Sequence, residues 1–211
     1  MPKIVDHDER RREVIAAVVR VIARSGIDSS TVRSIAREAG ISTGNLAHYF
    51  ANKDDILTSA LELSHDRIKQ RWDLKLDGLA GTAALRELVL DNLPLDEERQ
   101  VETRLEMSYW ARALALPGVL DVQRREASEL FRRISRLVDE ARKMGEITST
   151  ESTRSIAEYL LALIDGLSVH AILYPDRLSA TFQRRLVEDR LAALGGGKAP
   201  ARRRRKPSTK T

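Results

Sequence analysis

The sequence TVRSIAREAGISTGNLAHYFANK, residues 31–53, decides the fold expected for this chain. It predicts two short helices joined by a tight turn at Gly40, because glycine readily adopts the positive φ that such a turn requires. The apolar positions that recur at helical spacing on either side of the turn are Val32, Ile35, Ala36, Leu46 and Phe50. This pattern is typical of a helix-turn-helix, whose second helix lies in the major groove of DNA. We therefore expect a DNA-binding regulator.

Helix-capping residues define the limits of the same helices independently. Thr31, Ser42 and Asn52 each precede an expected helix, and each carries a side-chain oxygen that can accept from a free backbone N–H group. Asp54 and Asp55 fall in the first turn of the third helix, where the helix dipole favours acidic side chains. An ordinary three-helix core with polar ends is the alternative. The agreement of the turn, the apolar positions and the caps favours DNA binding.

Two adjoining motifs, TVRSIAREAGIS at residues 31–42 and TGNLAHYFANKDDIL at residues 43–57, resemble the TetR family of transcriptional regulators. The segments STGNLAHYF at residues 42–50 and LALIDGL at residues 161–167 resemble its BetI-like branch, whose founding members regulate choline and betaine metabolism. The resemblance implies an all-α homodimer. In such a protein, an N-terminal three-helix DNA-binding domain precedes a larger helical domain that binds a small effector and dimerises. One departure is Ala47, where many members carry tyrosine.

The resemblance also implies which residues contact DNA. Thr31 and Lys53 correspond to phosphate contacts, and Thr43, Gly44 and Asn45 to base-reading and close-approach positions. His48 and Tyr49 correspond to contacts with the DNA backbone and bases. The complete expected DNA-binding set is Thr31, Arg33, Ser42, Thr43, Gly44, Asn45, His48, Tyr49 and Lys53. Three consecutive arginines near the N-terminus, residues 10–12, can approach the DNA backbone or form an ordinary solvated face.

Composition agrees with an all-α protein. Of the 211 residues, 32% are charged and only 4% are aromatic, and strand-like alternation is absent. We expect about nine helices in three parts: a DNA-binding domain over residues 1–52, an effector-binding and dimerisation domain over residues 53–195, and a basic disordered tail over residues 196–211. The helix from residue 53 to about residue 76 is long enough to link the two domains mechanically.

The same composition argues against several other classes of protein. There is no cysteine, so neither a disulfide nor a thiolate metal site is expected, and the four histidines lie far apart without the spacing of metal ligands. We expect no cofactor and no enzyme activity, because the chain has no glycine-rich phosphate loop and no nucleophile elbow. The polar N-terminus and the charged residues that interrupt the apolar stretch 156–174 predict a soluble, cytoplasmic protein with no membrane partner.

The net positive charge of the chain comes from its C-terminal tail. Residues 196–211 hold seven Lys and Arg residues and no acid, so the net charge of +5 falls to −2 without them. A segment rich in Gly, Pro and Ser cannot bury a core and is expected to be disordered. The tail can add non-specific attraction to phosphates, or it can serve only to keep the protein in solution.

The helix expected over residues 152–173 is apolar on nearly every side, so one face can meet the domain core and another a partner subunit. It forms the expected dimerisation pair with the last helix, residues 181–194. The expected interface residues are Leu160, Ile164, Leu167, Phe182, Leu186 and Leu191. A homodimer presents two recognition helices about 34 Å apart, which suits a near-palindromic operator.

An effector site is expected between the helix of residues 96–116 and the helix of residues 152–173. Its expected lining is Trp72, Glu106, Met107, Tyr109, Trp110, Tyr159, Leu163, Asp165 and His170. Aromatic rings beside a carboxylate suit a cationic amine or a quaternary ammonium ligand. The alternative is that Trp110 and Tyr159 are ordinary core residues, and that Asp165 bonds across the dimer or to a backbone group.

Together these features predict a ligand-responsive, homodimeric repressor of a palindromic operator, which a small effector releases by binding the C-terminal domain. A TetR-like activator and an architectural protein that binds DNA without sequence preference are the alternatives. The recognition-helix pattern favours sequence-specific binding over the architectural alternative, whereas activators and repressors share it.

Overall fold

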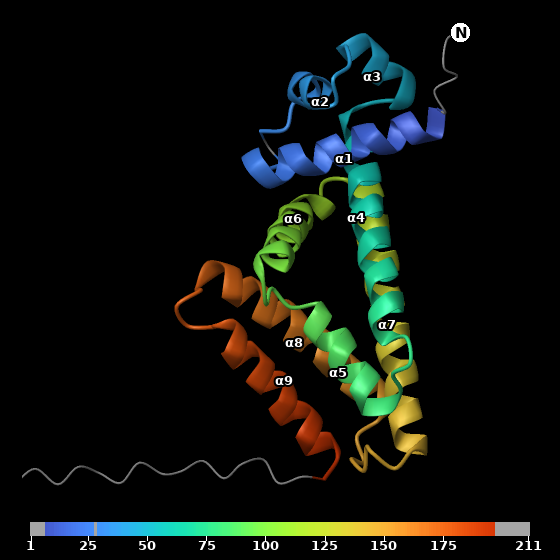
Figure 1. Ribbon diagram of the computed structural model, residues 1–211, viewed down its shortest axis with the longest axis vertical. Coiled ribbons are helices and arrows are strands. Elements are labelled where there is room, and N and C mark those ends of the chain that lie inside the picture. The colour runs from blue at the N-terminus through green and yellow to red at the C-terminus, as the bar shows by residue number, and fades with distance from the viewer. Residues whose placement is uncertain (1–6, 28, 197–211) are drawn as a thin grey trace, which may run out of the picture.

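The computed structural model describes residues 7–27 and 29–196, and all the regular structure in those ranges is helical. This confirms the predicted all-α class, and the described part of the chain contains nine helices. Figure 1 shows the N-terminal helices stacked at one end of an elongated molecule. Beneath them, α4 and α7 pack side by side along the long axis, and the other helices of the body lie on one side of this pair.

The N-terminal end is built from α1 (His7–Ser25), α2 (Val32–Glu38) and α3 (Thr43–Tyr49), followed by the long α4 (Lys53–Leu76). The apolar side chains of the helix-turn-helix face inward as the sequence predicts, because Ile35, Ala36, Leu46 and Phe50 are all buried. The exception is Val32, which is 38% exposed. These helices therefore form the expected three-helix unit, and α4 carries the chain away from it.

The body contains α5 (Gly81–Asp91), α6 (Glu97–Ala113), α7 (Pro117–Lys143), α8 (Thr153–Leu173) and α9 (Ala180–Leu194). The boundaries lie within a turn of those expected. The α7 helix begins at Pro117, directly after the end expected at residue 116 for the preceding helix. Proline suits the first helical position because its φ is already helical and its missing N–H group is not needed there.

The hydrophobic interior forms two clusters. The upper core joins α1–α3 and the first half of α4 to residues of α6 and to the start of α7. The lower core joins the end of α4 to α5, the rest of α7, α8 and α9. The domain boundary expected after residue 52 stays a prediction, but α6 and α7 contribute to the same core as the DNA-binding helices. The tail expected to be disordered lies, from residue 197 onward, outside the described residues.

The packing of α8 and α9 bears on the expected dimer interface. Leu160, Ile164, Leu167 and Leu191 are at most 8% exposed and belong to the lower core of a single protomer. Since they already pack within their own chain, they are not exposed to a partner subunit, and the dimer interface itself stays a prediction. Of the expected interface residues, Leu186 is partly buried against this core, and Phe182 is 42% exposed.

The apolar character of α8 also bears on the membrane question. By length and composition alone, the helix Thr153–Leu173 is long and apolar enough to cross a membrane. Its polar residues are therefore weaker evidence against a membrane span than the sequence analysis suggests. In the structure, Ile156, Ala157 and Leu160 of this helix are fully buried in the lower core. The inner face of the helix is therefore apolar because it packs in the core of the body.

Candidate nucleic-acid interface and effector site

The start of α2 is held by reciprocal hydrogen bonds between Thr31 and Ser34. The Ser34 backbone N–H donates to Thr31 Oγ1 at 3.1 Å, and the Thr31 backbone N–H donates to Ser34 Oγ at 2.9 Å. This arrangement satisfies two backbone donors that would otherwise have no partner. It also fixes Thr31 at an exposed helix N-terminus, where the free N–H groups and the dipole favour a phosphate.

The turn and the recognition helix are fixed by backbone geometry and a second cap. Gly40 has a φ of 65°, the left-handed conformation for which glycine was expected. Ser42 Oγ accepts from the backbone N–H of Asn45 at 3.0 Å and so caps α3. Leu46 and Phe50 anchor the inner face of α3, with exposed fractions of 1% and 4%.

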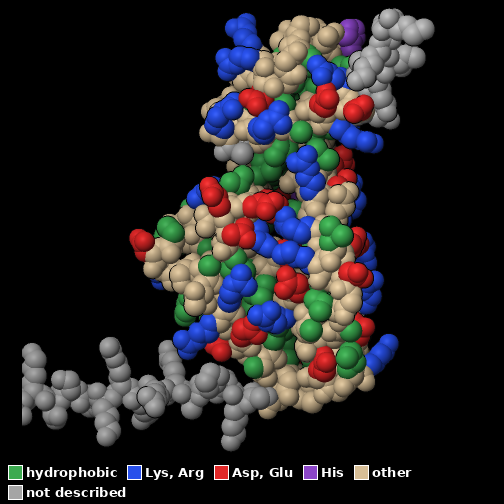
Figure 2. Space-filling model, viewed as in Figure 1, with side chains coloured by type: hydrophobic (Ala, Val, Ile, Leu, Met, Phe, Trp, Pro, Cys, Tyr) green, Lys and Arg blue, Asp and Glu red, His purple; other side chains and the backbone are tan. Residues whose placement is uncertain are grey.

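The outer face of α3 is open. Thr43, Gly44, Asn45 and His48 are exposed, whereas Tyr49 is half-buried against the upper core. Among the remaining residues expected to contact DNA, Thr31, Arg33 and Ser42 are exposed, and Lys53 is half-buried at the start of α4. Figure 2 shows basic side chains projecting from the end of the molecule formed by these helices. The structure thus brings the nine expected residues to one end of the molecule.

The three N-terminal arginines differ in their surroundings. Arg10 pairs with Glu13 on the same helix, and Arg12 is exposed. Arg11 donates to Ser59 Oγ on α4 at 2.8 Å, and its guanidinium carbon lies 4.9 Å from the centroid of the Phe50 ring. The arginine run is therefore not a uniform solvated face, because one member packs between helices.

Tyr109 has a different place from the one expected of an effector-binding residue. Its side chain is fully buried in the upper core, and its hydroxyl donates to the backbone carbonyl of Leu57 at 2.8 Å. Burial of the ring raises the pKa of the hydroxyl far above its usual value, so this group stays protonated and keeps its hydrogen bond. Tyr109 therefore ties α6 to the first half of α4, where it is not available to a ligand.

A polar cluster does form where α4, α6, α7 and α8 approach one another. Glu106 of α6 accepts from Trp110 Nε1 at 3.0 Å and lies 3.4 Å from His65 Nε2 of α4. The Nε2 atoms of His65 and Gln123 are shielded from solvent without a well-formed hydrogen bond. Neither residue is among those expected from the sequence, where histidine was considered only as a metal ligand. No local signal pairs His65 with Glu106, because the two residues are 41 positions apart and meet only through the packing of α4 on α6.

The two carboxyl groups of this cluster behave in opposite ways. Desolvation raises the pKa of Glu106, but the polar contacts with His65, Gln123 and Trp110 and the charge of His65 outweigh it and hold that pKa below its usual value. Desolvation raises the pKa of Asp165 to about 6, and the negative charge of Glu106 adds to the shift. Because Asp165 is also exposed, its carboxyl is crowded by protein yet reachable from solvent. The described residues place no cation beside it.

Several residues expected around the effector lie elsewhere. Trp72 is 5% exposed in the lower core, where Arg133 covers its ring at 5.5 Å. Tyr159 is 48% exposed and stacks with Arg190 of α9 at 4.2 Å. His170 meets the ring of Tyr174 edge-on at the end of α8. Met107 and Leu163 are half-buried on α6 and α8. The structure therefore brings together Glu106, Trp110 and Asp165 from the expected set.

Two surface recesses lie away from this cluster. One, of about 410 Å³, is between α7 and α8 and is lined by Phe131, Ser135, Thr153, Arg154 and Glu158. The other, of about 430 Å³, lies along α4 and is lined by Gln70, Asp73, Leu74 and Asp77. Neither is lined by a residue expected to bind the effector. Within the described residues, no group of three His, Cys, Asp or Glu side chains is arranged to hold a metal ion.

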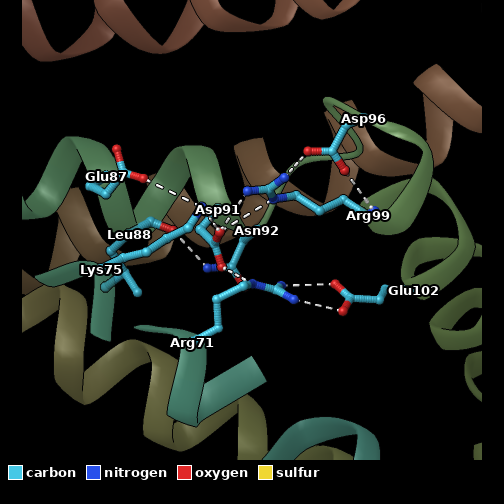
Figure 3. Close-up of polar contacts among 9 residues, drawn as sticks. All are labelled: Arg71, Lys75, Glu87, Leu88, Asp91, Asn92, Asp96, Arg99 and Glu102. Carbon is cyan, nitrogen blue, oxygen red and sulfur yellow. Dashed lines mark hydrogen bonds and ion pairs between the residues drawn. The ribbon is translucent and has the colours of Figure 1, made fainter. Parts of the chain in front are cut away.

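A network of charged side chains fixes α4 to α5 and α6 beside the polar cluster (Figure 3). The Asp91 side chain is 1% exposed and accepts from Arg71 at 2.8 Å, Lys75 at 2.7 Å and Arg99 at 3.0 Å. Arg71 also forms two parallel hydrogen bonds with Glu102 of α6, at 2.7 and 2.8 Å. Desolvation raises the pKa of Asp91, but the hydrogen bonds from Lys75 and Arg71 outweigh it and lower that pKa overall.

An open recognition helix on an all-α body defines the class of protein as a helix-turn-helix transcriptional regulator. Residues 14–60 match the bacterial regulatory proteins of the tetR family, and residues 81–196 match the family described as BetI-type transcriptional repressor, C-terminal. The chain therefore belongs to the TetR family of transcriptional regulators, with a C-terminal part of the BetI type.

Individual relatives agree with this assignment over most of their length. The chain is 29% identical to the HTH-type transcriptional regulator PksA of Bacillus subtilis, covering 92% of this chain and 94% of that protein. It is 28% identical to the regulator BetI of Escherichia coli K12, covering 86% and 91% of the two chains. It is also similar to the crystal structure of a transcriptional regulator from Saccharomonospora viridis in complex with choline. That match has 25% identity and a TM-score of 0.80, and it covers 86% of this chain and 95% of the other.

Proposed function

We propose that the protein is a homodimeric repressor that binds a palindromic operator and is released by a small cationic amine. The observation that carries DNA binding is the open face of α3, where Thr43, Gly44 and Asn45 are exposed while Leu46 and Phe50 anchor the helix from behind. Phosphate contacts at Thr31 and Lys53 would orient the helix, and the exposed residues at its start would read base edges. The protein would thus act by binding in the cytoplasm and not by catalysis.

The dimer would form through the exposed face of α8 and the adjoining face of α9. Tyr159 and Leu173 of α8 and Phe182 of α9 are 48%, 55% and 42% exposed, which is unusual for such large apolar side chains. Gly166 lies on α8 with open space where a Cβ atom would be. Close approach of a second α8 would explain a glycine in the middle of this helix, where it otherwise costs about 1 kcal/mol relative to alanine.

The effector would bind at the polar cluster formed by Glu106, Trp110 and Asp165. Two carboxylates and an indole ring suit a quaternary ammonium group, which is attracted by negative charge and by the face of an aromatic ring. Asp165 has no cation beside it among the described residues, so it is free to pair with such a ligand. The choline bound by the Saccharomonospora viridis regulator supports the same class of ligand.

The signal would pass from the effector to the DNA through α6. This helix carries Glu106 on the polar cluster, while its neighbour Tyr109 bonds to Leu57 of α4 in the upper core. A ligand that moves Glu106 therefore moves the attachment of α4, and with it the spacing of the two recognition helices. A coupling free energy of about 1–3 kcal/mol changes operator occupancy severalfold or more.

The test is a selection of genomic DNA fragments by the purified protein at near-physiological salt, with and without choline. We expect recovery of one palindromic sequence, and a loss of that sequence when choline is added. Recovery of DNA without sequence preference would contradict the specific regulator and favour the architectural alternative. If choline strengthened operator binding, the proposal that the effector releases the protein from DNA would be wrong. If choline had no effect on operator binding, choline would not be the effector.

A further inference from the structure

Arg11 of α1 reaches the turn that joins the recognition helix to α4. One guanidinium nitrogen donates to Ser59 Oγ at 2.8 Å, and the same nitrogen lies 3.9 Å from Asp55 Oδ1. The guanidinium carbon lies over the ring of Phe50, the residue that ends α3, at 4.9 Å. Ser59 and Phe50 are 5% and 4% exposed, so these contacts are made against the interior.

The partners of Arg11 are the groups that shape this turn. Asp55 Oδ2 accepts from the backbone N–H of Ala51 at 2.9 Å, and the Asp55 backbone N–H donates to the capping oxygen of Asn52 at 2.9 Å. The turn between Phe50 and Asp55 sets the direction of α3 relative to α4. A side chain that holds both ends of this turn therefore helps to set where α3 points.

The neighbours of Arg11 provide a contrast. Arg12 is exposed, and Arg10 pairs with Glu13 at the surface. All three carry the same charge at the same end of α1, so an effect of charge alone would be similar for each of them. Among the three, and within the described residues, Arg11 is the one that makes a hydrogen bond, an ion pair or a ring contact with Phe50 and α4.

We propose that Arg11 is a positioning residue for operator binding, which holds the end of the recognition helix against α4 without contacting DNA itself. This inference rests on the proposed function. The planar guanidinium is needed because it stacks on Phe50 and donates to Ser59 at the same time, and a lysine ammonium cannot reproduce that geometry.

The experiment compares Arg11→Lys, Arg11→Met and the matched control Arg12→Met in titrations with the selected operator over a range of salt concentrations. We expect both Arg11 variants to bind about tenfold more weakly, which corresponds to about 1.4 kcal/mol. Arg12→Met should lose much less, and Arg11→Lys should keep the wild-type salt slope, because no phosphate contact is removed. Wild-type affinity in Arg11→Lys, or equal losses in Arg11→Met and Arg12→Met, would overturn the proposal.

A second measurement needs no DNA, so it separates this inference from the proposed function. Hydrogen exchange of the Ala51 amide should be faster in Arg11→Lys than in the wild type, while amides of the lower core exchange as before. Ser59→Ala removes the acceptor of Arg11 and should accelerate the same amide, which gives a test if an Arg11 variant fails to fold. Unchanged hydrogen exchange of the Ala51 amide in these variants would overturn the positioning role, even if the protein binds a specific operator.

Discussion

At the scale of single residues, Gly44 is a position where the requirements of the fold and those of DNA binding can be tested separately. Its backbone is helical, and a Cβ atom there would meet only Ser42 Oγ at 3.7 Å, an ordinary contact. The protein therefore does not need glycine at this position. Gly40 differs, because its φ of 65° is a conformation that other residues adopt at a cost.

Gly44→Ala should leave the fold as stable as the wild type or more so, by up to about 1 kcal/mol from helix propensity. The same variant should weaken operator binding, because the added methyl group lies where the recognition helix comes closest to DNA. Thermal unfolding and operator titration measure the two effects. The control, Gly40→Ala, should lose about 1 kcal/mol or more of stability. Operator affinity unchanged in Gly44→Ala would remove this position from the interface.

The proposed choline site predicts a dependence on pH, because it includes the Asp165 carboxyl. Its pKa of about 6 means that the carboxyl is ionised at pH 7 and takes up a proton below pH 6. Since only the ionised form attracts a cation, choline affinity should fall as pH decreases, by up to about tenfold per pH unit below the pKa. Calorimetric titration between pH 7 and pH 5 measures this. Asp165→Asn should bind choline weakly at every pH, and an Asp165→Asn profile that matches the wild type would contradict the assignment.

At the scale of helices, Asp91 joins three elements through one buried carboxylate. Arg71 and Lys75 come from α4, and Arg99 comes from α6, so the end of α5 is the point to which both helices are attached (Figure 3). Removing the buried carboxylate takes from three partly buried cations the partner that they share, although each keeps one further carboxylate nearby. The stability of this junction therefore depends on the whole network.

Asp91→Asn should lower the free energy of unfolding by about 3–5 kcal/mol, because three partly buried cations lose the carboxylate that they share. The control is Glu188→Gln, which breaks an ion pair with Arg86 whose two side chains are each 44% exposed. That loss should be within about 1 kcal/mol. Urea denaturation measures both variants, and equal losses would show that the Asp91 network contributes no more than a surface pair.

The same carboxyl predicts the direction of acid sensitivity. The pKa of Asp91 is lower in the folded protein than its ordinary value, so on acidification the unfolded chain binds this proton first. The stabilisation from Asp91 is present at neutral pH and is lost as pH falls below about 4. Asp91→Asn should therefore lose less stability than the wild type on going from pH 6 to pH 3. A parallel loss in both proteins would assign the acid sensitivity to other groups.

At the scale of the whole molecule, one protomer carries one recognition helix, so reading a palindrome requires two copies. The face proposed for this contact includes Gly166, whose missing side chain leaves open space in the protomer. Gly166→Gln should leave the protomer folded, with improved helix propensity, but should prevent close approach of the two α8 helices. Analytical ultracentrifugation should show monomers, and binding to the palindrome should weaken together with the loss of dimer.

The control for the dimer is Arg154→Gln at the start of α8, where the Arg154 side chain is 83% exposed. This variant should remain dimeric. A Gly166→Gln protein that sediments as a dimer would place the interface on another face of the molecule.

The helices and the DNA-binding end of this protein follow from local features of its sequence. The turn at Gly40, the caps at Thr31 and Ser42, and the apolar spacing around Leu46 are local signals, because each acts on groups within a few residues along the chain. Local signals can be read without knowing the fold. They were enough to place the exposed face of α3 and the helix boundaries within a turn.

Only the tertiary structure decided which distant residues meet. Tyr109 and Leu160 were expected at an effector site and a subunit interface, but both are packed inside the protomer. Periodicity shows that a residue is apolar on one helix face, but not which neighbouring helix covers that face. The placement of His65 beside Glu106, and of Arg11 over Phe50, depends on helices 41 and 39 residues apart along the chain. Such contacts follow from how whole helices pack, and only the folded chain fixes that packing.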